Sequence, residues 1–478
     1  MINLGGNRGR GLRKTIDWTL VIMYMMLVLI GWANIYSSVQ ATDSTALLDF
    51  NNRSGKQFIW IVAAIILAIF ILFIISPRIY EGLALPIYLF AVFLLLAVIV
   101  LGVEVKGSRS WFEFGPIRFQ PAEISKISTS LMLAAVMSQL GYKISRIKDF
   151  IITALIILVP MGIIIMQSET GSALVYVGFI FMLYREGLSG WLIFMAGMAI
   201  LLFILTLTGS SYVALLVLAG VSSFCIMLYS GRGKWWALVG IPVITLMAFL
   251  PSLLPEGFAI TPLHIILGLI AILVPVAAFR AFRERNRFTQ FSLIATIAGI
   301  MLVFSTEYIF NNVLQEHQRK RIEVLLGMQE DPSGVGYNVI QSKIAIGSGG
   351  LWGKGYMEGT QTTFGFVPEQ STDFIFCTIG EEWGFVGCTA VILLYVLLIW
   401  RIVRRAEQSR ESFTRIYGYC VACCIFMHLF INVGMTLGLM PVIGIPLPLV
   451  SYGGSSLWAF TIMIFIFIAL DRNERKYF

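Results

Sequence analysis

Carboxylates and a lysine stand at the edges of long apolar segments, where charged side chains are rare. Asp373 opens one apolar run, and Glu381 and Glu382 follow two turns deeper. Glu123 and Lys126 open an earlier run three residues apart, on one face of a helix. A charge within a membrane is costly, so such residues usually face a cavity. Carboxylates accept protons and lysines bind anions, so this is the chemistry that a site built from them could perform.

Each of these charges also has a purely structural explanation. Asp is a favoured N-cap, so Asp373 could do no more than start a helix. Glu123 and Lys126 could simply neutralise each other, and the two glutamates after Asp373 could face a wet crevice without chemistry. Glu169, in a turn at 167–172, is predicted on the same side of the membrane. The combination of acids and a base on one face, under a long glycine-rich loop, favours a functional site.

The apolar runs themselves define the class of protein. The 478 residues are 58% apolar and 13% charged, whereas soluble domains contain about 25% charged residues. This composition excludes an ordinary soluble enzyme and a disordered chain. Runs of about 20 residues can cross about 30 Å of hydrocarbon, and we expect an all-α polytopic protein with about fourteen spans, those within 149–184 being broken or re-entrant. They are expected near 18–38, 57–76, 82–102, 121–140, 149–166, 171–184, 190–209, 212–229, 234–253, 263–282, 290–310, 373–400, 416–437 and 452–470.

The distribution of Lys and Arg orients these spans. Basic residues are enriched in cytoplasmic segments. With the N-terminus inside and the sides alternating, about two thirds of the 34 Lys and Arg residues fall inside, from the cluster at 8–14 to that at 401–415, and the acids favour the outside. We therefore expect both termini in the cytoplasm and Asp373 outside. The first run, from Trp18, is interpreted as a retained span rather than a cleavable signal.

Other patterns carry no chemistry. The six cysteines lie in or beside apolar runs and are interpreted as small apolar side chains rather than metal ligands. The run Gly347–Gly355 resembles a phosphate-binding loop, but Ser348 replaces the first glycine and Gly355 the final Ser or Thr. The net charge of +8 forms no basic stripe interleaved with exposed aromatics, so nucleic acid is not an expected partner.

Two connections differ from the short loops elsewhere. Residues 311–372 form one long glycine-rich loop, which is expected outside and is long enough to indicate function. Within it, Tyr337–Ile346 has helical spacing and predicts a short interfacial helix. The segment Asn432–Ser456 contains four prolines, so it cannot be a continuous helix and is expected to line a cavity.

Six motifs together resemble the SEDS family (shape, elongation, division and sporulation), whose members are membrane peptidoglycan glycosyltransferases. The start of the chain and Gly359–Gln361 are more similar to the elongation member than to the division member. The family has about ten spans, so the resemblance implies a four-helix insertion. The expected organisation is a core at 1–189, extra helices at 190–289, a core span at 290–310, an outer loop at 311–372 and the last core spans at 373–478. The motifs are Phe114–Lys126, Asp331–Gly355, Gly359–Gln361, Val367–Phe376, Gly380–Gly387 and Asn432–Ser456.

The resemblance implies polymerisation of lipid II into glycan strands for cell elongation, at the outer face of the bacterial cytoplasmic membrane. Asp373 is then the general base on the acceptor hydroxyl. Undecaprenyl pyrophosphate leaves, and Lys126 and Arg109 are candidates to bind it, with Glu123 orienting Lys126. Further site residues are Glu369 and Glu169, which could shape the site or help to hold a divalent cation, Mg or Mn. The expected partner is a class B penicillin-binding protein, a transpeptidase.

Two alternatives remain open at this point. Broken helices and intramembrane charges also suit a lipid-precursor flippase or another transporter. A scaffold that recruits a transpeptidase would need its outer loops but not Asp373. The turn at Glu169 departs from the family, which has Asp there, so the longer side chain leaves the role of Glu169 undecided.

Overall fold

A computed structural model gives the structure, and the chain falls into two compact units. The first unit holds Met1–Leu188 and Glu330–Phe478, and the second holds Ser189–Gln329. The expected span at 234–253 and the basic cluster at 8–14 lie outside the described residues. Within the described residues, nine helices are long and apolar enough to cross a membrane. The structure describes residues 16–40, 52–105, 107–115, 117–208, 210–229, 262–284, 287–314, 316–325 and 335–477.

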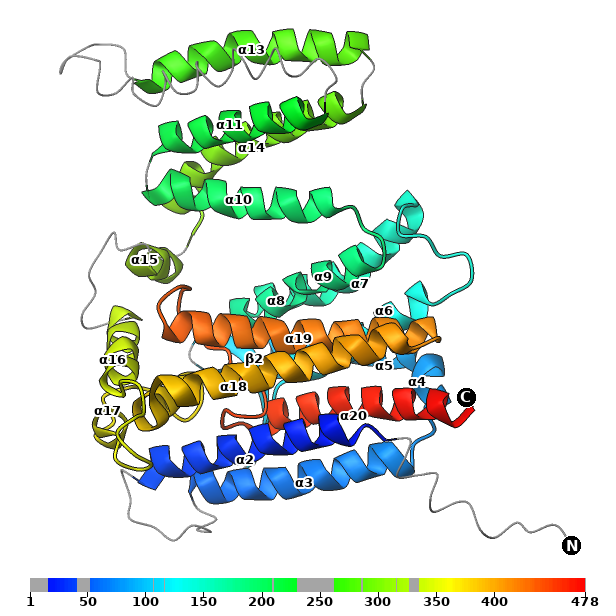
Figure 1. The fold of residues 1–478 in the computed structure, drawn as a ribbon, viewed down its shortest axis with the longest axis vertical. Coiled ribbons are helices and arrows are strands. Elements are labelled where there is room, and N and C mark those ends of the chain that lie inside the picture. The colour runs from blue at the N-terminus through cyan, green and yellow to red at the C-terminus, as the bar shows by residue number, and fades with distance from the viewer. Residues whose placement is uncertain are drawn as a thin grey trace, which may run out of the picture. The chain divides into compact units, whose positions relative to one another are not determined.

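The first unit is a bundle of long helices around α19 and α20 (Figure 1). These two helices are the most enclosed spans, with 83% and 78% of their apolar stretches buried. α19 packs on α18 and α6, and α20 packs on α3. The other helices cover them and leave apolar side chains outward, as a bilayer requires. The helices are α2 (Trp18–Gln40), α3 (Arg53–Phe73), α4 (Arg78–Gly82), α5 (Ala84–Leu101), α6 (Pro121–Met137), α7 (Ile147–Met166), α8 (Thr170–Val177), α9 (Phe179–Arg185), α16 (Val335–Ser348), α17 (Thr360–Thr363), α18 (Ile375–Gln408), α19 (Ser412–Thr436) and α20 (Gly454–Tyr477).

A small antiparallel sheet joins α5 to α6. Its strands are β1 (Val103–Val105), β2 (Ser108–Phe114) and β3 (Ile117–Phe119), in the order β1-β2-β3. The register pairs Glu104 with Arg109 and Glu113 with Arg118. Opposite charges across the strands stabilise this hairpin, which leads into α6 with a proline in its first turn.

Two spans are broken. The predicted break within 149–184 is confirmed, because α7 ends at Met166, a turn follows, and two short helices, α8 and α9, complete the segment. A second break was not predicted. α18 is interrupted at Gly384, which has φ 64° and ψ −161°, a conformation that glycine tolerates and other residues rarely adopt. The first part of α18 is therefore a separate half-helix ending beside Trp383.

The region expected as one long loop, 311–372, contains helices. α15 (Glu316–Leu325) belongs to the second unit, and α16 and α17 belong to the first. The helix predicted at 337–346 is present as α16. One of its faces is buried, because Ala345 on α16 packs against Phe374 and Cys377.

The second unit is a smaller helical cluster. Its helices besides α15 are α10 (Gly190–Thr208), α11 (Ser211–Tyr229), α13 (Pro262–Glu284) and α14 (Arg287–Asn312). The sequence assigned 290–310 to the core, but this was wrong for packing, because α14 packs on α10, α11 and α13. The physical reason is the small shared core of this unit, formed by Leu202, Ala214, Leu215, Leu218, Ile266 and Val303.

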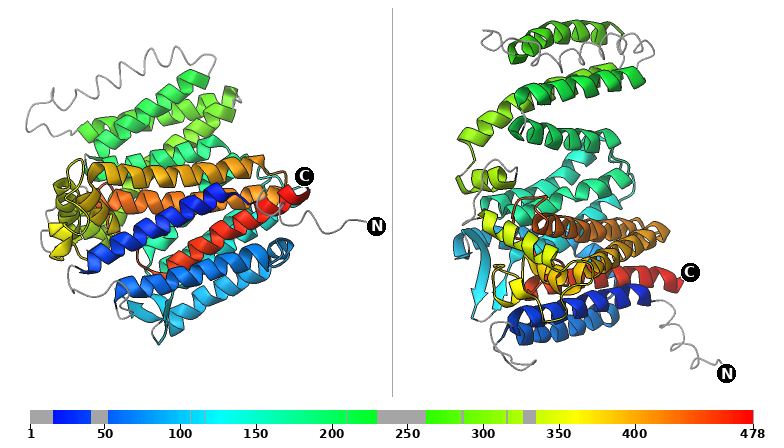
Figure 2. Two further views of the ribbon diagram at one scale, coloured as in Figure 1. Left: turned by 60° about the horizontal axis from the view of Figure 1, so that its bottom comes forward. Right: turned by 60° about the vertical axis from the view of Figure 1, so that its left-hand side comes forward.

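The two ends of the first unit differ in their polar residues. We call one the Asp373 end, where α18 begins and where Gln370 Nε2 donates to the Ser38 carbonyl at the end of α2 (2.8 Å). We call the other the arginine end, where Asp17 binds Arg401 and Arg405. α16 and α17 lie at the first end, and the C-terminus lies at the second in both views of Figure 2.

Candidate active site

Asp373 lies in a turn that leads directly into the first half of α18. The helix begins at Ile375, and the residue at its cap position is Phe374, which makes no side-chain cap hydrogen bond. Asp373 therefore does not occupy the N-cap position that we considered for it, because that position falls on the next residue. The Asp373 side chain is partly exposed. It stands beside the amino end of a helix, where the partial positive charge stabilises a carboxylate.

The backbone of Glu369 closes this turn. Its carbonyl accepts hydrogen bonds from the amides of Thr372 (3.1 Å) and Phe374 (3.2 Å). Glu369 has φ 54°, a left-handed conformation that costs free energy for a residue with a Cβ. Its carboxylate accepts a hydrogen bond from Thr372 Oγ1 (3.0 Å). The described contacts of Glu369 therefore fix the turn that presents Asp373, rather than a metal ion.

An amide side chain from α19 holds the Asp373 backbone. Asn432 is fully buried, and its Nδ2 donates to the carbonyls of Asp373 (2.8 Å) and Ile445 (2.7 Å). The carboxyl of Asp373 faces Gly444, because a Cβ on that glycine would lie 3.4 Å from Asp373 Oδ2. Gly444 also has φ 77°, so glycine suits both the backbone and the approach of the carboxyl.

The proline-rich segment is joined to the Asp373 turn along its length. Ser451 Oγ donates to the Thr372 carbonyl (2.6 Å), and the Tyr452 amide donates to the Ser371 carbonyl (2.8 Å). As expected from its prolines, the segment between α19 and α20 is not a continuous helix. Its hydrogen bonds instead make it one wall around Asp373.

Arg53 is a cation at this site that the sequence analysis missed. It begins α3, is exposed, and donates from Nη1 to Ser371 Oγ (2.7 Å), two residues before Asp373. Its guanidinium also lies 5.9 Å from the centre of the Tyr452 ring. The only sequence signal was a basic residue at the start of a span on the side predicted to be outside.

Lys126 is enclosed in the interior of the bundle. Its Nζ donates to Glu123 Oε1 and to His428 Nε2, each at 2.8 Å, and its side chain is 1% exposed. Glu123 thus contacts Lys126 directly, as their three-residue spacing predicts. It does not support the direct contact that we expected between Lys126 and a diphosphate, because surrounding helices cover the ammonium group.

His428, on α19, carries its ring hydrogen on one defined nitrogen. Its Nδ1 lies 3.1 Å from the Pro446 carbonyl, which can only accept, so Nδ1 carries the hydrogen. Nε2 is then the acceptor for Lys126. These two hydrogen bonds connect α6, through α19, to the proline-rich segment, at a residue two positions beyond Gly444.

Glu169 lies in the turn between α7 and α8, close to this buried cluster. Gln120 Nε2 and Ser172 Oγ both donate to its Oε1, the latter at 3.2 Å. Burial raises the pKa of Glu169, and the nearby Glu123 carboxylate raises it further, against hydrogen bonds from Ser110, Ser172 and Gln120. The longer side chain therefore reaches Gln120, between β3 and α6.

Arg109 lies on the outer surface of the hairpin. It pairs with Glu104 at 3.5 Å, and both side chains are more than half exposed. The described contacts do not bring Arg109 together with Lys126 or Asp373, as we had expected for two ligands of one diphosphate. Its pairing with Glu104 is explained by the cross-strand register alone.

Glu381 organises the glycine-rich loop instead of facing a wet crevice. It is fully buried and accepts hydrogen bonds from Lys354 Nζ (2.7 Å) and from the amides of Gln361 (2.8 Å) and Thr362 (2.9 Å). The loop approaches α18 closely, since a Cβ on Gly353 would lie 2.0 Å from the Glu382 carbonyl. These glycines therefore serve packing, in agreement with the rejection of a phosphate loop.

Cavities and metal ligands do not add to this arrangement. Asp373 lines neither the cavity in the second unit nor a cavity in the first unit that is lined by Gly141, Glu186 and Arg415. Among the described residues, no group of three or more His, Cys, Asp or Glu side chains could hold a metal ion. The expected metal role of Glu169 and Glu369 thus finds no ligand set in this part of the chain.

The fold and site define a multi-pass α-helical membrane protein with an acidic residue fixed at the start of a broken span. A family model described as "Cell cycle protein", which covers FtsW, RodA and SpoVE, matches residues 17–225 and 264–476. The chain belongs to this family, whose motifs are those of the SEDS proteins. The unmatched stretch, 226–263, is shorter than the region 190–289 where we expected additional helices, because 190–225 and 264–289 also match the family model.

Named relatives agree with the family. The peptidoglycan glycosyltransferase MrdB of Escherichia coli is 32% identical over 383 residues, covering 80% of this chain and 76% of that protein. The peptidoglycan glycosyltransferase RodA of Treponema pallidum is 31% identical over 465 residues, covering 96% and 98%.

Solved structures share the fold. One chain from a study of polymerization and crosslinking by a peptidoglycan synthase complex aligns with TM-score 0.59 and 24% identity, over 96% of this chain and 98% of that one. The Thermus thermophilus rod shape determining protein RodA aligns with TM-score 0.52 and 24% identity, over 96% and 97%.

Proposed function

We propose that this protein is a peptidoglycan glycosyltransferase that polymerises lipid II into glycan strands for cell elongation. The observation that carries the proposal is Asp373, whose backbone is fixed by Asn432 and whose carboxyl is partly exposed beside Gly444. Relatives with this activity in their names align over most of the chain. The site therefore presents a proton acceptor where such an enzyme needs one.

In the proposed reaction, Asp373 is the general base. The 4-hydroxyl of the acceptor sugar gives its proton to the Asp373 carboxylate while its oxygen forms a bond to the anomeric carbon of the donor. The bond from that carbon to the diphosphate oxygen breaks, and undecaprenyl pyrophosphate leaves with the electron pair. The proton passes from Asp373 to water. The inverted product is an implication of the family.

We assign the cation nearest to this chemistry to Arg53. It is exposed, and Ser371 fixes it two residues from Asp373. Lys126 acts instead through His428, whose ring supports the Pro446 carbonyl in the wall that contains Gly444. Glu123 neutralises Lys126 within this relay. The proposal gives a metal ion no step, because the described residues supply no ligand set for one.

We place the Asp373 end outside the bacterial cytoplasmic membrane and the arginine end, with both termini, in the cytoplasm. The support is the excess of Lys and Arg at the arginine end. An outer site suits lipid II polymerisation, and lateral access between spans suits its lipid tail. We further propose a class B penicillin-binding protein as the transpeptidase partner, since one structural neighbour comes from a peptidoglycan synthase complex.

The proposal is tested with the purified full chain and lipid II in detergent, where no compartments exist. We expect glycan polymer from the wild-type chain and none from the Asp373→Ala chain, with a class B penicillin-binding protein added in parallel reactions. Polymer cannot form in detergent if the chain only transports lipid precursors. Absence of polymer under all of these conditions contradicts the proposal, and equal polymer from the Asp373→Ala chain contradicts the base assignment.

A further inference from the structure

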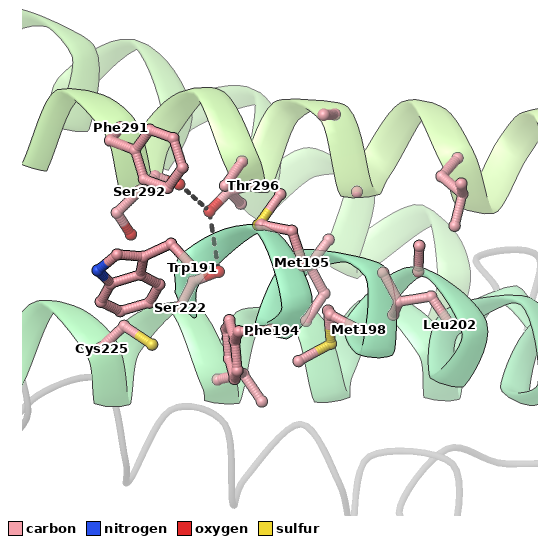
Figure 3. A pocket seen from close by; sticks show the side chains of 17 residues that line it. Trp191, Phe194, Met195, Met198, Leu202, Ser222, Cys225, Phe291, Ser292 and Thr296 are labelled. Carbon is pink, nitrogen blue, oxygen red and sulfur yellow. Dashed lines mark hydrogen bonds between the residues drawn. The ribbon is translucent and has the colours of Figure 1, made fainter. Parts of the chain in front are cut away.

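The second unit contains a cavity that the proposed reaction does not use. It has a volume of about 130 Å³ and is lined by α10, α11 and α14 (Figure 3). Its lining residues are Trp191, Phe194, Met195, Met198, Ala199, Leu202, Leu218, Val221, Ser222, Cys225, Phe291, Ser292, Ala295, Thr296, Ala298, Gly299 and Leu302. The volume is large enough for several methylene groups.

The cavity is long and follows the helix axes. On α10 it extends from Trp191 to Leu202, and at 1.5 Å per residue this is about 16 Å. One leaflet of a bilayer has about the same depth, since the whole hydrocarbon core is about 30 Å thick. Only 6% of the α10 span is buried within the protein. Hydrocarbon chains of the bilayer are therefore the neighbours of this cavity.

The two ends of the cavity differ in polarity. Trp191 and three hydroxyl groups gather at one end, and Leu202 lies toward the other, as Figure 3 shows. Ser222 and Thr296 are hydrogen bonded at 2.8 Å, and Thr296 donates to the Ser292 carbonyl (2.8 Å). Tryptophan and hydroxyl groups at one end of an apolar slot match the carbonyl region of a lipid above its chain.

The lining also indicates which kind of lipid fits. None of its residues is Lys, Arg or His. A polyprenyl phosphate carries its charge directly on the chain, so its phosphate would meet no cation among the residues that line the cavity. A glycerophospholipid places ester carbonyls between the chain and the phosphate. Ser292 can donate a hydrogen bond to such a carbonyl, while the phosphate stays in the headgroup region.

We propose that this cavity binds one acyl chain of a bilayer glycerophospholipid, with the ester carbonyl at the Ser292 end and the chain directed toward Leu202. The bound chain fills space between α10, α11 and α14 that their own side chains leave empty. It thereby acts as a packing element of the second unit. This site is separate from the residues around Asp373.

The test uses the full chain in nanodiscs that contain a phospholipid with a photoreactive diazirine in one acyl chain. After irradiation, mass spectrometry should locate adducts on Met195, Met198 and neighbouring lining residues. Ala295→Phe places a ring in the cavity and should lower these adducts by about tenfold. This is the loss of affinity expected when about two methylene groups of the acyl chain are no longer buried. Ile294→Phe is the matched control, because Ile294 is 65% exposed and does not line the cavity.

A second pair covers the case in which Ala295→Phe does not fold. Cys225→Trp narrows the mouth of the cavity, and Phe224→Trp changes an exposed neighbour that is not part of the lining. Equal adducts in a filled variant and its control overturn the proposal, as do adducts confined to outward residues such as Ile294. A diazirine polyprenyl phosphate runs in parallel, and stronger labelling by it at Met195 and Met198 overturns the assignment to an acyl chain.

Discussion

The two ends of the first unit bury carboxylates in opposite ways. At the arginine end, Asp17 is 3% exposed and receives Arg401 (2.8 Å), Arg405 (2.5 Å) and, farther away, Arg475 (3.7 Å). At the Asp373 end, one buried cation, Lys126, serves Glu123 and His428 together.

The two ends also differ in how fully their carboxylate oxygens are hydrogen bonded. Within the described part of the chain, the second oxygens of Glu123, Glu169 and Glu382 are buried without a hydrogen-bond partner. Such oxygens cost free energy, and they are typical of sites whose structure is not chosen for stability alone. Arginines surround Asp17 at one end, whereas these three carboxylates at the other end each keep one oxygen unsatisfied.

The pKa values follow the same division. Burial acts to raise the pKa of Asp17, but hydrogen bonds from Arg405 and Arg401 outweigh it and hold the value below 3.8. Glu169 has a raised pKa because it is buried beside Glu123. The arginines thus favour the charged form of Asp17, whereas burial beside Glu123 favours the protonated form of Glu169.

The sharpest test of this comparison is Asp373→Asn. We expect turnover of lipid II to fall by about 10²–10⁴, the usual contribution of a general base. The thermal midpoint in detergent should stay unchanged, because the backbone contact with Asn432 is kept. A large loss of stability with normal turnover would instead make Asp373 a structural residue and remove the contrast between the ends.

Lys126→Met should produce the next largest effect. It leaves Glu123 buried without its cation, which we expect to cost about 3–5 kcal/mol of unfolding free energy. The control is Lys126→Met with Glu123→Gln, in which no charge is left unpaired. If denaturant unfolding is restored in the double variant while lipid II turnover stays low, Lys126 acts on the reaction through His428. Recovery of both stability and turnover in the double variant would assign Lys126 a structural role only.

Asp17→Asn should affect stability alone. We expect a loss of about 2 kcal/mol near neutral pH, since hydrogen bonds to a charged group are removed. The folded pKa of Asp17 is lowered, so its stabilisation is present above pH 3.8 and is lost as the pH falls through the folded value. Thermal unfolding at several pH values should show the difference from wild type shrinking below about pH 4. Normal turnover at neutral pH is expected, and its loss would argue that the two ends are not independent.

Arg109→Ala should have the smallest effect. Its pair with Glu104 is exposed on both sides and should contribute less than about 1 kcal/mol. We expect lipid II turnover within about twofold of wild type, because the described contacts do not connect Arg109 to Asp373. A loss comparable to that of Asp373→Asn would restore Arg109 as a ligand of the diphosphate.

Local sequence patterns predicted the helices well. Apolar runs of bilayer length located the start of each described span to within a few residues, but α18 and α20 extend beyond their expected ends at 400 and 470. The prolines in Asn432–Ser456 correctly excluded a continuous helix. The pair Glu123 and Lys126 was visible because three residues separate them along one helix face.

Contacts between distant segments could not be predicted in this way. His428 meets Lys126 across 302 positions, and Arg53 meets Ser371 across 318. The enclosure of Lys126 depends on how α6, α19 and α20 pack, which hydropathy does not specify. The break at Gly384 lies where Gly353 approaches from another segment, and the residues around Gly384 do not specify that approach.

The break at Gly384 separates a short half-helix from the rest of α18. Ile375–Trp383 is bound to the glycine-rich loop through Glu381 and is set off from the rest of α18 by Gly384. A partner that binds this loop would contact a half-helix whose first residue lies two positions after Asp373. A contact made on that loop would therefore reach the Asp373 turn through this half-helix, and not through the longer part of α18 beyond Gly384.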